Sequence, residues 1–143
     1  MRQLGSQCQR NRWLRLRPLP RKAQKTLAAF AARLQSTPEA VPALASALDF
    51  RLAQKKQVLI AGDPTYQDTR ELLRQVYTRL LPNKVLLLAD GGAGQQQLAR
   101  WLPFVAGAHR MQGHATAYVC ENYVCKLPTT DPETMARLLD NKQ

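Results

Sequence analysis

Apolar residues recur with a helical period in the stretch that follows residue 22. Leu27, Phe30, Ala31 and Leu34 stand at positions i, i+3, i+4 and i+7, the spacing that lines one face of an α-helix with apolar side chains. The pattern predicts an amphipathic helix that begins near Ala23 and buries this face.

A second helix is expected directly after the first. Residues 36–39 read Ser-Thr-Pro-Glu, which matches a capping box and places Pro38 in the first helical turn. Pro42 offers an alternative start, since proline is favoured at the first position of a helix. The apolar residues that follow repeat with the same period: Leu44, Ala47, Leu48 and Leu52. The two helices predict an αα-hairpin over residues 23–56.

Two short apolar runs separated by a helical pattern predict a βαβ unit. Residues 57–61 are rich in β-branched and other apolar side chains, and residues 85–89 are apolar throughout, as expected of a strand covered on both faces. Residues 67–81 between them are expected to be helical, with Asp68 as the N-cap. The predicted core stripe of this helix consists of Leu72, Leu73, Val76, Tyr77 and Leu80. A right-handed parallel connection follows from this order of elements.

The last third of the chain completes a small α/β unit. A glycine-rich turn leads into a helix over residues 95–102, and two strands over residues 115–120 and 124–127 form a hairpin. Residues 131–133 read Asp-Pro-Glu and open a final helix. The chain is therefore predicted to be an α/β protein. An N-terminal helical hairpin is followed by a three-layer-like α/β domain over residues 57–143, with a βαβ core, a C-terminal β-hairpin and a helix.

Charge is distributed unevenly along the 143 residues, which carry a formal net charge of +11. Eight of the 21 basic residues lie in the first 25 positions, whereas the first acidic residue is Glu39. We expect residues 1–22 to form a basic, disordered arm, because they contain no sustained apolar run and end in a Pro-Leu-Pro segment. Three roles for this arm stay open: a mitochondrial presequence, a nucleic-acid-binding arm and a membrane-surface segment.

The sequence shows no feature that would send the chain through a membrane. The apolar core that a secretory signal needs is not found, and no run approaches the roughly 20 apolar residues of a membrane span. A cytoplasmic location is the default expectation, with mitochondrial targeting by the arginine-rich arm as the alternative.

Cys120 and Cys125 are the cysteines that lie near each other in the sequence. Across a tight hairpin they could form a disulfide, while as buried thiols they would behave as small apolar residues. A thioredoxin-type redox role is not expected, because such catalysts carry C-x-x-C at a helix N-terminus. Zinc is not expected either, because this C-x4-C pair is accompanied only by His109 and His114.

Asp63 and Asp90 follow the two predicted parallel strands, where the carboxyl ends of such strands form a ligand crevice. The turn over residues 90–94 precedes a helix and has three glycines, but the G-x-G-x-x-G spacing and the Walker lysine are both missing. His109 and His114 fall in a connection without a clear pattern. We therefore predict no catalytic residue, metal or cofactor, and name the Asp63 and Asp90 crevice as the place where a ligand would bind.

Three segments carry a resemblance to a known family. Residues 58–64 read Val-Leu-Ile-Ala-Gly-Asp-Pro, and residues 81–91 read Leu-Pro-Asn-Lys-Val-Leu-Leu-Leu-Ala-Asp-Gly. Residues 117–132 read Ala-Tyr-Val-Cys-Glu-Asn-Tyr-Val-Cys-Lys-Leu-Pro-Thr-Thr-Asp-Pro. Together they resemble the C-terminal part of the spermatogenesis-associated protein 20 family, which has bacterial counterparts. The resemblance covers residues 23–139.

The resemblance implies a parent protein with a thioredoxin-like domain followed by a helical toroid of the six-hairpin glycosidase type. The Cys-His-Trp-Cys motif of the thioredoxin-like domain has no counterpart here, so no catalytic residue carries over. We expect a non-catalytic C-terminal fragment or short form with a link to spermatogenesis or fertility. Its helical hairpin would be a remnant of the toroid, and its partner the toroid or the thioredoxin-like domain. The alternative is a module whose basic arm binds nucleic acid or acidic surfaces, although we do not expect nucleic acid to be the main partner.

Overall fold

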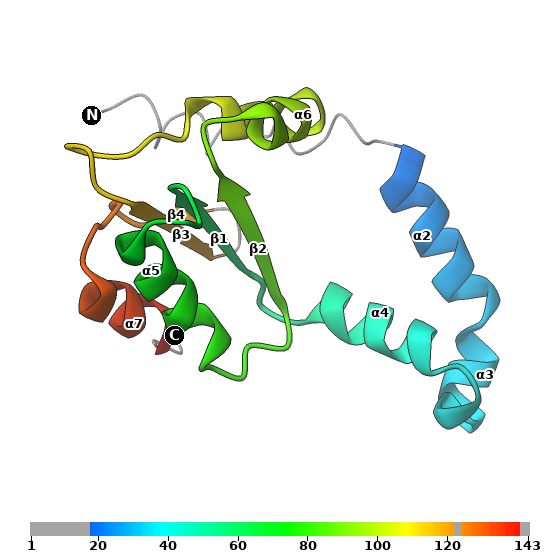
Figure 1. Ribbon diagram of the computed structural model, residues 1–143. Helices are drawn as coiled ribbons and strands as arrows, with labels where there is room; N and C mark the ends of the chain where they lie inside the picture. The colour runs from blue at the N-terminus through cyan, green and yellow to red at the C-terminus, as the bar shows by residue number, and fades with distance from the viewer. Residues whose placement is uncertain (1–17, 122–123, 141–143) are drawn as a thin grey trace. The chain divides into compact units, whose positions relative to one another are not determined.

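The computed structural model describes residues 18–121 and 124–140. The chain divides into a helical unit, described over residues 18–54, and an α/β unit that begins at Lys55 (Figure 1). The boundary lies two residues before the one expected from the sequence. The mixed α/β class with helices at the N-terminal end is confirmed.

The helical unit starts earlier than the sequence pattern indicated. Its elements are α2 (Pro18–Ala29), α3 (Ala31–Ser36), the 3-10 helix η2 (Pro38–Ala40) and α4 (Pro42–Leu52). Residues 18–22, expected to belong to a disordered arm, are the first turns of α2. The first N–H groups of a helix have no intrahelical acceptor, so proline is tolerated there. Residues 1–17 of the expected arm lie outside the described residues.

Two local predictions in the helical unit were wrong. The first helix is not continuous, because Phe30 has a backbone φ of -103° and ψ of 11° that separates α2 from α3. The capping box does not form: Ser36 is the last residue of α3, and Thr37 makes no side-chain cap to η2. The alternative start at Pro42 is confirmed, since α4 has this proline in its first turn.

The α/β unit is built on a four-stranded mixed sheet with the order β2-β1-β3-β4. Its elements are β1 (Lys56–Ala61), α5 (Gln67–Tyr77), β2 (Lys84–Ala89), α6 (Ala93–Trp101), η3 (Pro103–Gly107), β3 (Thr116–Glu121), β4 (Val124–Cys125) and α7 (Pro132–Asp140). β1 and β2 are parallel, with Lys56 opposite Lys84, whereas β3 runs antiparallel to β1. The predicted βαβ unit is therefore confirmed, and so is the C-terminal hairpin with its helix.

The sheet lies between two layers of helices, because alternate residues of its strands point to opposite faces. Val58 and Ile60 of β1 pack with Leu72 and Val76 of α5 and with Met135 of α7. On the other face, the neighbouring β1 residues pack against η3 and the partly buried side of α6. Figure 1 shows α5 and α7 together on one side of the sheet and α6 on the other.

β2 is less buried than its apolar sequence predicted. Among its residues only Ala89 is fully buried, and the five before it are half-buried. β2 is an edge strand of the sheet, so one of its sides has no neighbouring strand. An apolar run alone did not distinguish a central strand from this edge position.

The predicted core stripe of α5 is only partly correct. Leu72 and Val76 are buried, but the side chains of Tyr77 and Leu80 are 69% and 94% exposed. The helix ends at Tyr77 rather than at residue 81. Leu80 therefore follows the helical period in sequence without lying on the helix.

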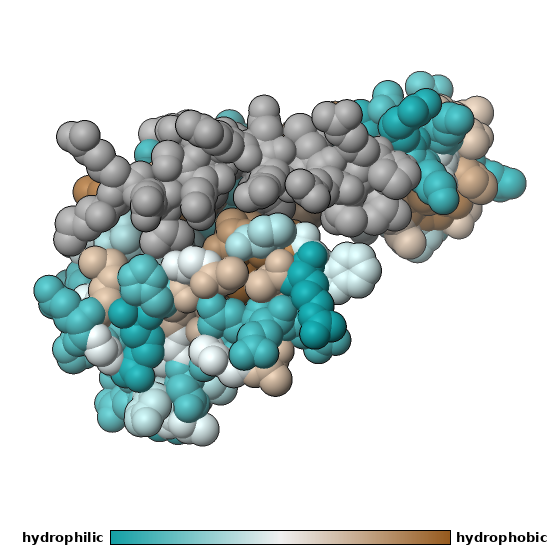
Figure 2. All heavy atoms as spheres, turned by 90° about the horizontal axis from the view of Figure 1, so that it is seen from above, coloured by the Kyte–Doolittle hydropathy of each residue, from teal (hydrophilic) through white to brown (hydrophobic). Residues whose placement is uncertain are grey.

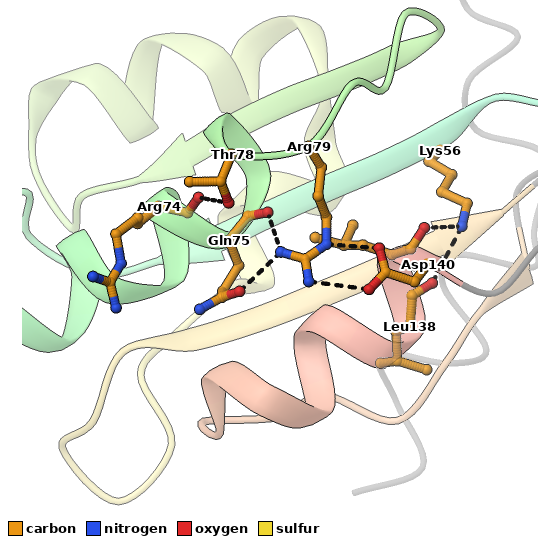
Figure 3. Close-up of polar contacts among 8 residues, drawn as sticks. Lys56, Arg74, Gln75, Thr78, Arg79, Leu138 and Asp140 are labelled. Atoms are coloured by element: carbon orange, nitrogen blue, oxygen red, sulfur yellow. Dashed lines mark hydrogen bonds and ion pairs between the residues drawn. The ribbon is translucent and has the colours of Figure 1, made fainter.

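Polar contacts join the ends of α5, α7 and β1 (Figure 3). The Arg79 guanidinium donates to both carboxylate oxygens of Asp140, at 2.7 and 3.0 Å, and to the backbone carbonyl of Gln75 at 2.9 Å. The Lys56 Nζ donates to the carbonyls of Leu138 and Leu139 at 3.3 and 2.5 Å. A cation at the end of a helix satisfies its last carbonyls and complements the helix dipole. These contacts fasten α7 to the sheet.

Candidate functional site

A cavity of about 420 Å³ opens where the parallel strands β1 and β2 end. The backbone N–H of Gly62 donates to the carbonyl of Ala89 at 2.9 Å, so the two strand ends stay side by side. Glycine suits position 62, because a Cβ there would collide with the Oγ1 of the buried Thr69. Small residues line most of the cavity, and its polar side chains are Asp90, Gln95, Gln96, His109 and Arg110.

Asp90 caps the N-terminus of α6. Its Oδ1 accepts from the backbone N–H groups of Gly92 and Gln95 at 2.8 and 3.1 Å. The turn between Asp90 and α6 needs a glycine at position 91, because this residue has a φ of +78°. A phosphate at this turn would need amides that the Asp90 carboxylate already occupies. The glycines therefore serve the turn and the cap.

Gln95 holds the two walls of the cavity together. Its side-chain Oε1 accepts from the Gly91 N–H at 2.8 Å, and its Nε2 donates to the carbonyls of Val105 and Ala108 at 2.8 and 3.0 Å. The first contact reaches the turn after β2, and the other two reach η3 and the residue after it. Sequence reasoning missed this role, because a glutamine in a short helix is most often simply solvated.

His109 and Arg110 lie at the rim of the cavity, although the sequence ranked the histidines as poor candidates. The His109 Nδ1 is 2.9 Å from the carbonyl of Gly107. The backbone carbonyl of His109 accepts from the Tyr118 hydroxyl at 2.9 Å. Burial raises the pKa of Tyr118, which therefore stays a donor at neutral pH. The sheet thus positions the loop that carries both rim residues.

Asp63 is close to the cavity but does not line it. Its Oδ1 accepts from the backbone N–H and the hydroxyl of Thr65 at 2.8 and 2.6 Å, and these hydrogen bonds lower the pKa of Asp63. The positive charge of Arg110 adds a smaller lowering. Of the pair predicted to form a crevice, the structure therefore places Asp90 in the cavity wall and holds Asp63 in its own turn.

Asp68 links α5 to the residue before β3 instead of capping α5. The residue at the N-cap position is Tyr66, which makes no side-chain cap. The Asp68 Oδ2 accepts from the Ala115 N–H at 2.7 Å, and this contact is the main cause of a lowered pKa. Arg110 approaches the same oxygen at 3.8 Å and lies over the Tyr66 ring at 5.1 Å from its centre. The prediction of an Asp68 cap was therefore wrong.

Cys120 and Cys125 form a disulfide across the β3–β4 hairpin. The two residues stand directly opposite each other in the strand pairing, which is the arrangement that brings their Cβ atoms close. Of the two alternatives that the sequence left open, the structure has the disulfide rather than free thiols. The bond closes the turn between the two strands and attaches the short edge strand β4 to the buried strand β3.

Within residues 18–121 and 124–140, no three His, Cys, Asp or Glu side chains group closely enough to hold a metal ion. No helix in these ranges is both long enough and apolar enough to cross a bilayer.

The chain is homologous to a short segment of spermatogenesis-associated protein 20. It is 42% identical to the human protein over 113 residues, which is 79% of this chain. The rat and mouse proteins are 42% and 41% identical over the same length. The chain spans 14% of the length of these curated relatives. No family model and no solved structure matches.

Proposed function

We propose that this chain, as a homologue of a segment of spermatogenesis-associated protein 20, is a non-catalytic module that works within a larger assembly. Its α/β unit folds around its own core, and its helical unit docks on helices of a parent-type protein. The contrast in burial between the units carries the proposal. Under this proposal the chain is a C-terminal fragment or short form of that protein. Its link to spermatogenesis is the one that the relatives' name suggests.

The helical unit has apolar stripes but no core of its own. No residue from 21 to 54 is buried, and the stripe residues Leu27, Leu34, Leu44 and Leu48 are only half-buried. Two further stripe residues are exposed: Phe30 is 45% exposed and Leu52 is 75% exposed. The helices of this unit show brown apolar surface beside teal polar surface at the right of Figure 2. Apolar helix faces of this kind are stabilised when they pack against further helices.

The curated relatives are long enough to contain such helices, because about six-sevenths of their length lies outside the matched segment. The resemblance described above implies that this remainder contains a helical toroid and a thioredoxin-like domain. We assign the toroid as the partner of the helical unit, since helix faces with a 3.6-residue period fit a helical neighbour.

Binding to the human relative from which the matched 113 residues have been deleted tests this assignment. We expect the chain to form a complex with that protein in size-exclusion chromatography. Leu52→Asp should abolish the complex, because a charge would enter an apolar interface. Leu80→Asp is the matched control, since Leu80 is also a largely exposed leucine and belongs to the α/β unit. Absence of a complex with the wild-type chain, or equal loss with both variants, contradicts the proposal.

The uneven charge distribution supports a second candidate function, in which the basic N-terminal segment binds nucleic acid or an acidic surface. Eight basic residues precede position 26 and no acidic residue precedes Glu39. Such binding is dominated by charge and weakens steeply between about 50 and 200 mM salt. A chain lacking residues 1–20 should then lose binding to single-stranded DNA in a fluorescence anisotropy titration. Salt-independent binding, or binding kept by the shortened chain, contradicts it.

A further inference from the structure

The cavity at the ends of β1 and β2 presents one carboxylate oxygen that is available to a ligand. Asp90 uses its Oδ1 to cap α6, and its Oδ2 has no hydrogen-bond partner among the described residues. An ionised carboxylate accepts hydrogen bonds only. A ligand that meets Asp90 must therefore bring a donor, and a positively charged donor makes the stronger contact.

The charges around the cavity also favour a cation over an anion. Arg110 is the basic side chain at the rim, but it already faces Asp68 at 3.8 Å and acts on Asp63 as well. Asp90, the acidic side chain in the cavity lining, makes no ion pair among the described residues. The negative charge of Asp90 is therefore less compensated than the positive charge of Arg110, although the whole chain has a net charge of +11. An anion would also find the amides after Asp90 occupied by its carboxylate.

The size and lining of the cavity limit the rest of the ligand. Its volume of about 420 Å³ is near the lower end of small-molecule sites. Ala99, Ala106 and Ala108 contribute methyl groups to the wall, which suit a short apolar body. Gln95 ties both walls together through three hydrogen bonds, so the cavity is formed before any ligand arrives.

From these observations we propose that the cavity binds a small organic ammonium compound. The ammonium group donates to the Oδ2 of Asp90, and a short carbon chain packs on the alanine wall. This inference concerns the α/β unit alone and stands whether or not the helical unit docks on a larger protein.

An NMR titration of the full chain with butylammonium chloride tests the proposal, with inorganic phosphate and butanol titrated in parallel at constant ionic strength. The amide signals of Gly91 and Gly92 report directly on the cavity. We expect butylammonium to shift these signals at lower concentration than either comparison compound. Phosphate or butanol acting at the same or lower concentration would overturn the proposal, and so would the lack of any shift.

Two variants make the test specific. Asp90→Asn keeps an acceptor for the α6 cap but removes the charge, and it should weaken butylammonium binding about fivefold. Ala106→Leu fills the cavity without changing its charge and should weaken binding as well. Asp131→Asn is the matched control, because Asp131 caps α7 on the opposite side of the sheet and should leave affinity unchanged. Unaltered affinity in both cavity variants, or equal loss in the control, would overturn the assignment to this cavity.

Discussion

The α/β unit and the helical unit carry comparable apolar stripes and bury them very differently. In the α/β unit, Ile60, Leu72 and Met135 are at most 1% exposed, because helices cover both faces of the sheet. In the helical unit, the stripe of α4 is half-buried at most. The difference shows that an amphipathic pattern indicates which face of a helix is suited to burial against other residues. Whether this chain itself supplies the cover depends on the tertiary structure.

Truncating a stripe leucine in each unit gives the largest expected contrast. Leu72→Ala should lower the free energy of unfolding of the α/β unit by about 3 kcal/mol, since it leaves a cavity in a closed core. Leu48→Ala should change it by less than about 0.5 kcal/mol, because the half-buried Leu48 lies outside that core. Urea unfolding followed by tryptophan fluorescence and circular dichroism measures both. Equal effects would mean that the two units share one cooperative core.

Removing the disulfide is expected to have the next largest effect, again confined to the α/β unit. The double variant Cys120→Ala with Cys125→Ala should lose about 2 kcal/mol of stability, because the unfolded chain regains the freedom of a short closed loop. Urea unfolding with and without reductant provides the check. Reductant should destabilise the wild-type chain to a similar degree and leave the double variant unaffected. A reductant effect that persists in the double variant would contradict this assignment.

Removing the Lys56 contact to α7 should lower the stability of the α/β unit by less than removing the disulfide. Lys56→Met removes the donor that reaches the last carbonyls of α7 and should destabilise the α/β unit by about 1 kcal/mol. Lys126→Met is the matched control at an exposed lysine and is expected to stay within about 0.5 kcal/mol. Hydrogen exchange of the α7 amides localises the effect. If α7 exchanges equally in both variants, the Lys56 contact does not hold the helix.

The smallest expected effect is a pH dependence that belongs to Asp68. The Ala115 N–H lowers the pKa of folded Asp68 below its unfolded value of about 3.9. This contact therefore stabilises the fold above about pH 4, and the contribution is lost as the pH falls through the lower, folded pKa. Asp68→Asn should reduce the loss of stability measured by urea unfolding between pH 7 and pH 3. Glu39→Gln in the helical unit should leave it unchanged; a reduction equal to that of Asp68→Asn would contradict this origin.

The sequence predicted the type and order of nearly all elements but several of their limits were wrong. Residues 18–22 fell outside the predicted helix because two prolines there read as the end of an arm. Residue 80 was placed in the stripe of α5 because its spacing fits, although the helix ends at Tyr77. Periodicity reports faces, whereas helix ends depend on caps and turns that compete over only one or two residues.

The candidate site was predictable only as a location. Asp90 was identified because parallel strands bring their carboxyl ends together. His109, Arg110 and Gln95 lie in a connection and a short helix that carry no recognisable motif. These residues come together because η3 packs against α6, and the hydrogen bond from the Gln95 side chain to the Val105 carbonyl holds the two elements in place. Such contacts leave almost no trace in a single sequence.

By itself, the sequence determined the α/β class, the parallel βαβ unit, the concentration of positive charge near the N-terminus and the kinship to a much longer protein. These follow from local patterns that every chain carries in its order of residues. Only the tertiary structure decided that β2 lies at an edge, that Asp68 accepts a hydrogen bond from Ala115 before β3, that the two cysteines form a disulfide, and which residues surround the cavity. Most of these depend on groups far apart in the chain, whose proximity is decided by the packing of the whole unit. The two cysteines are only five residues apart, and the strand pairing places them opposite each other.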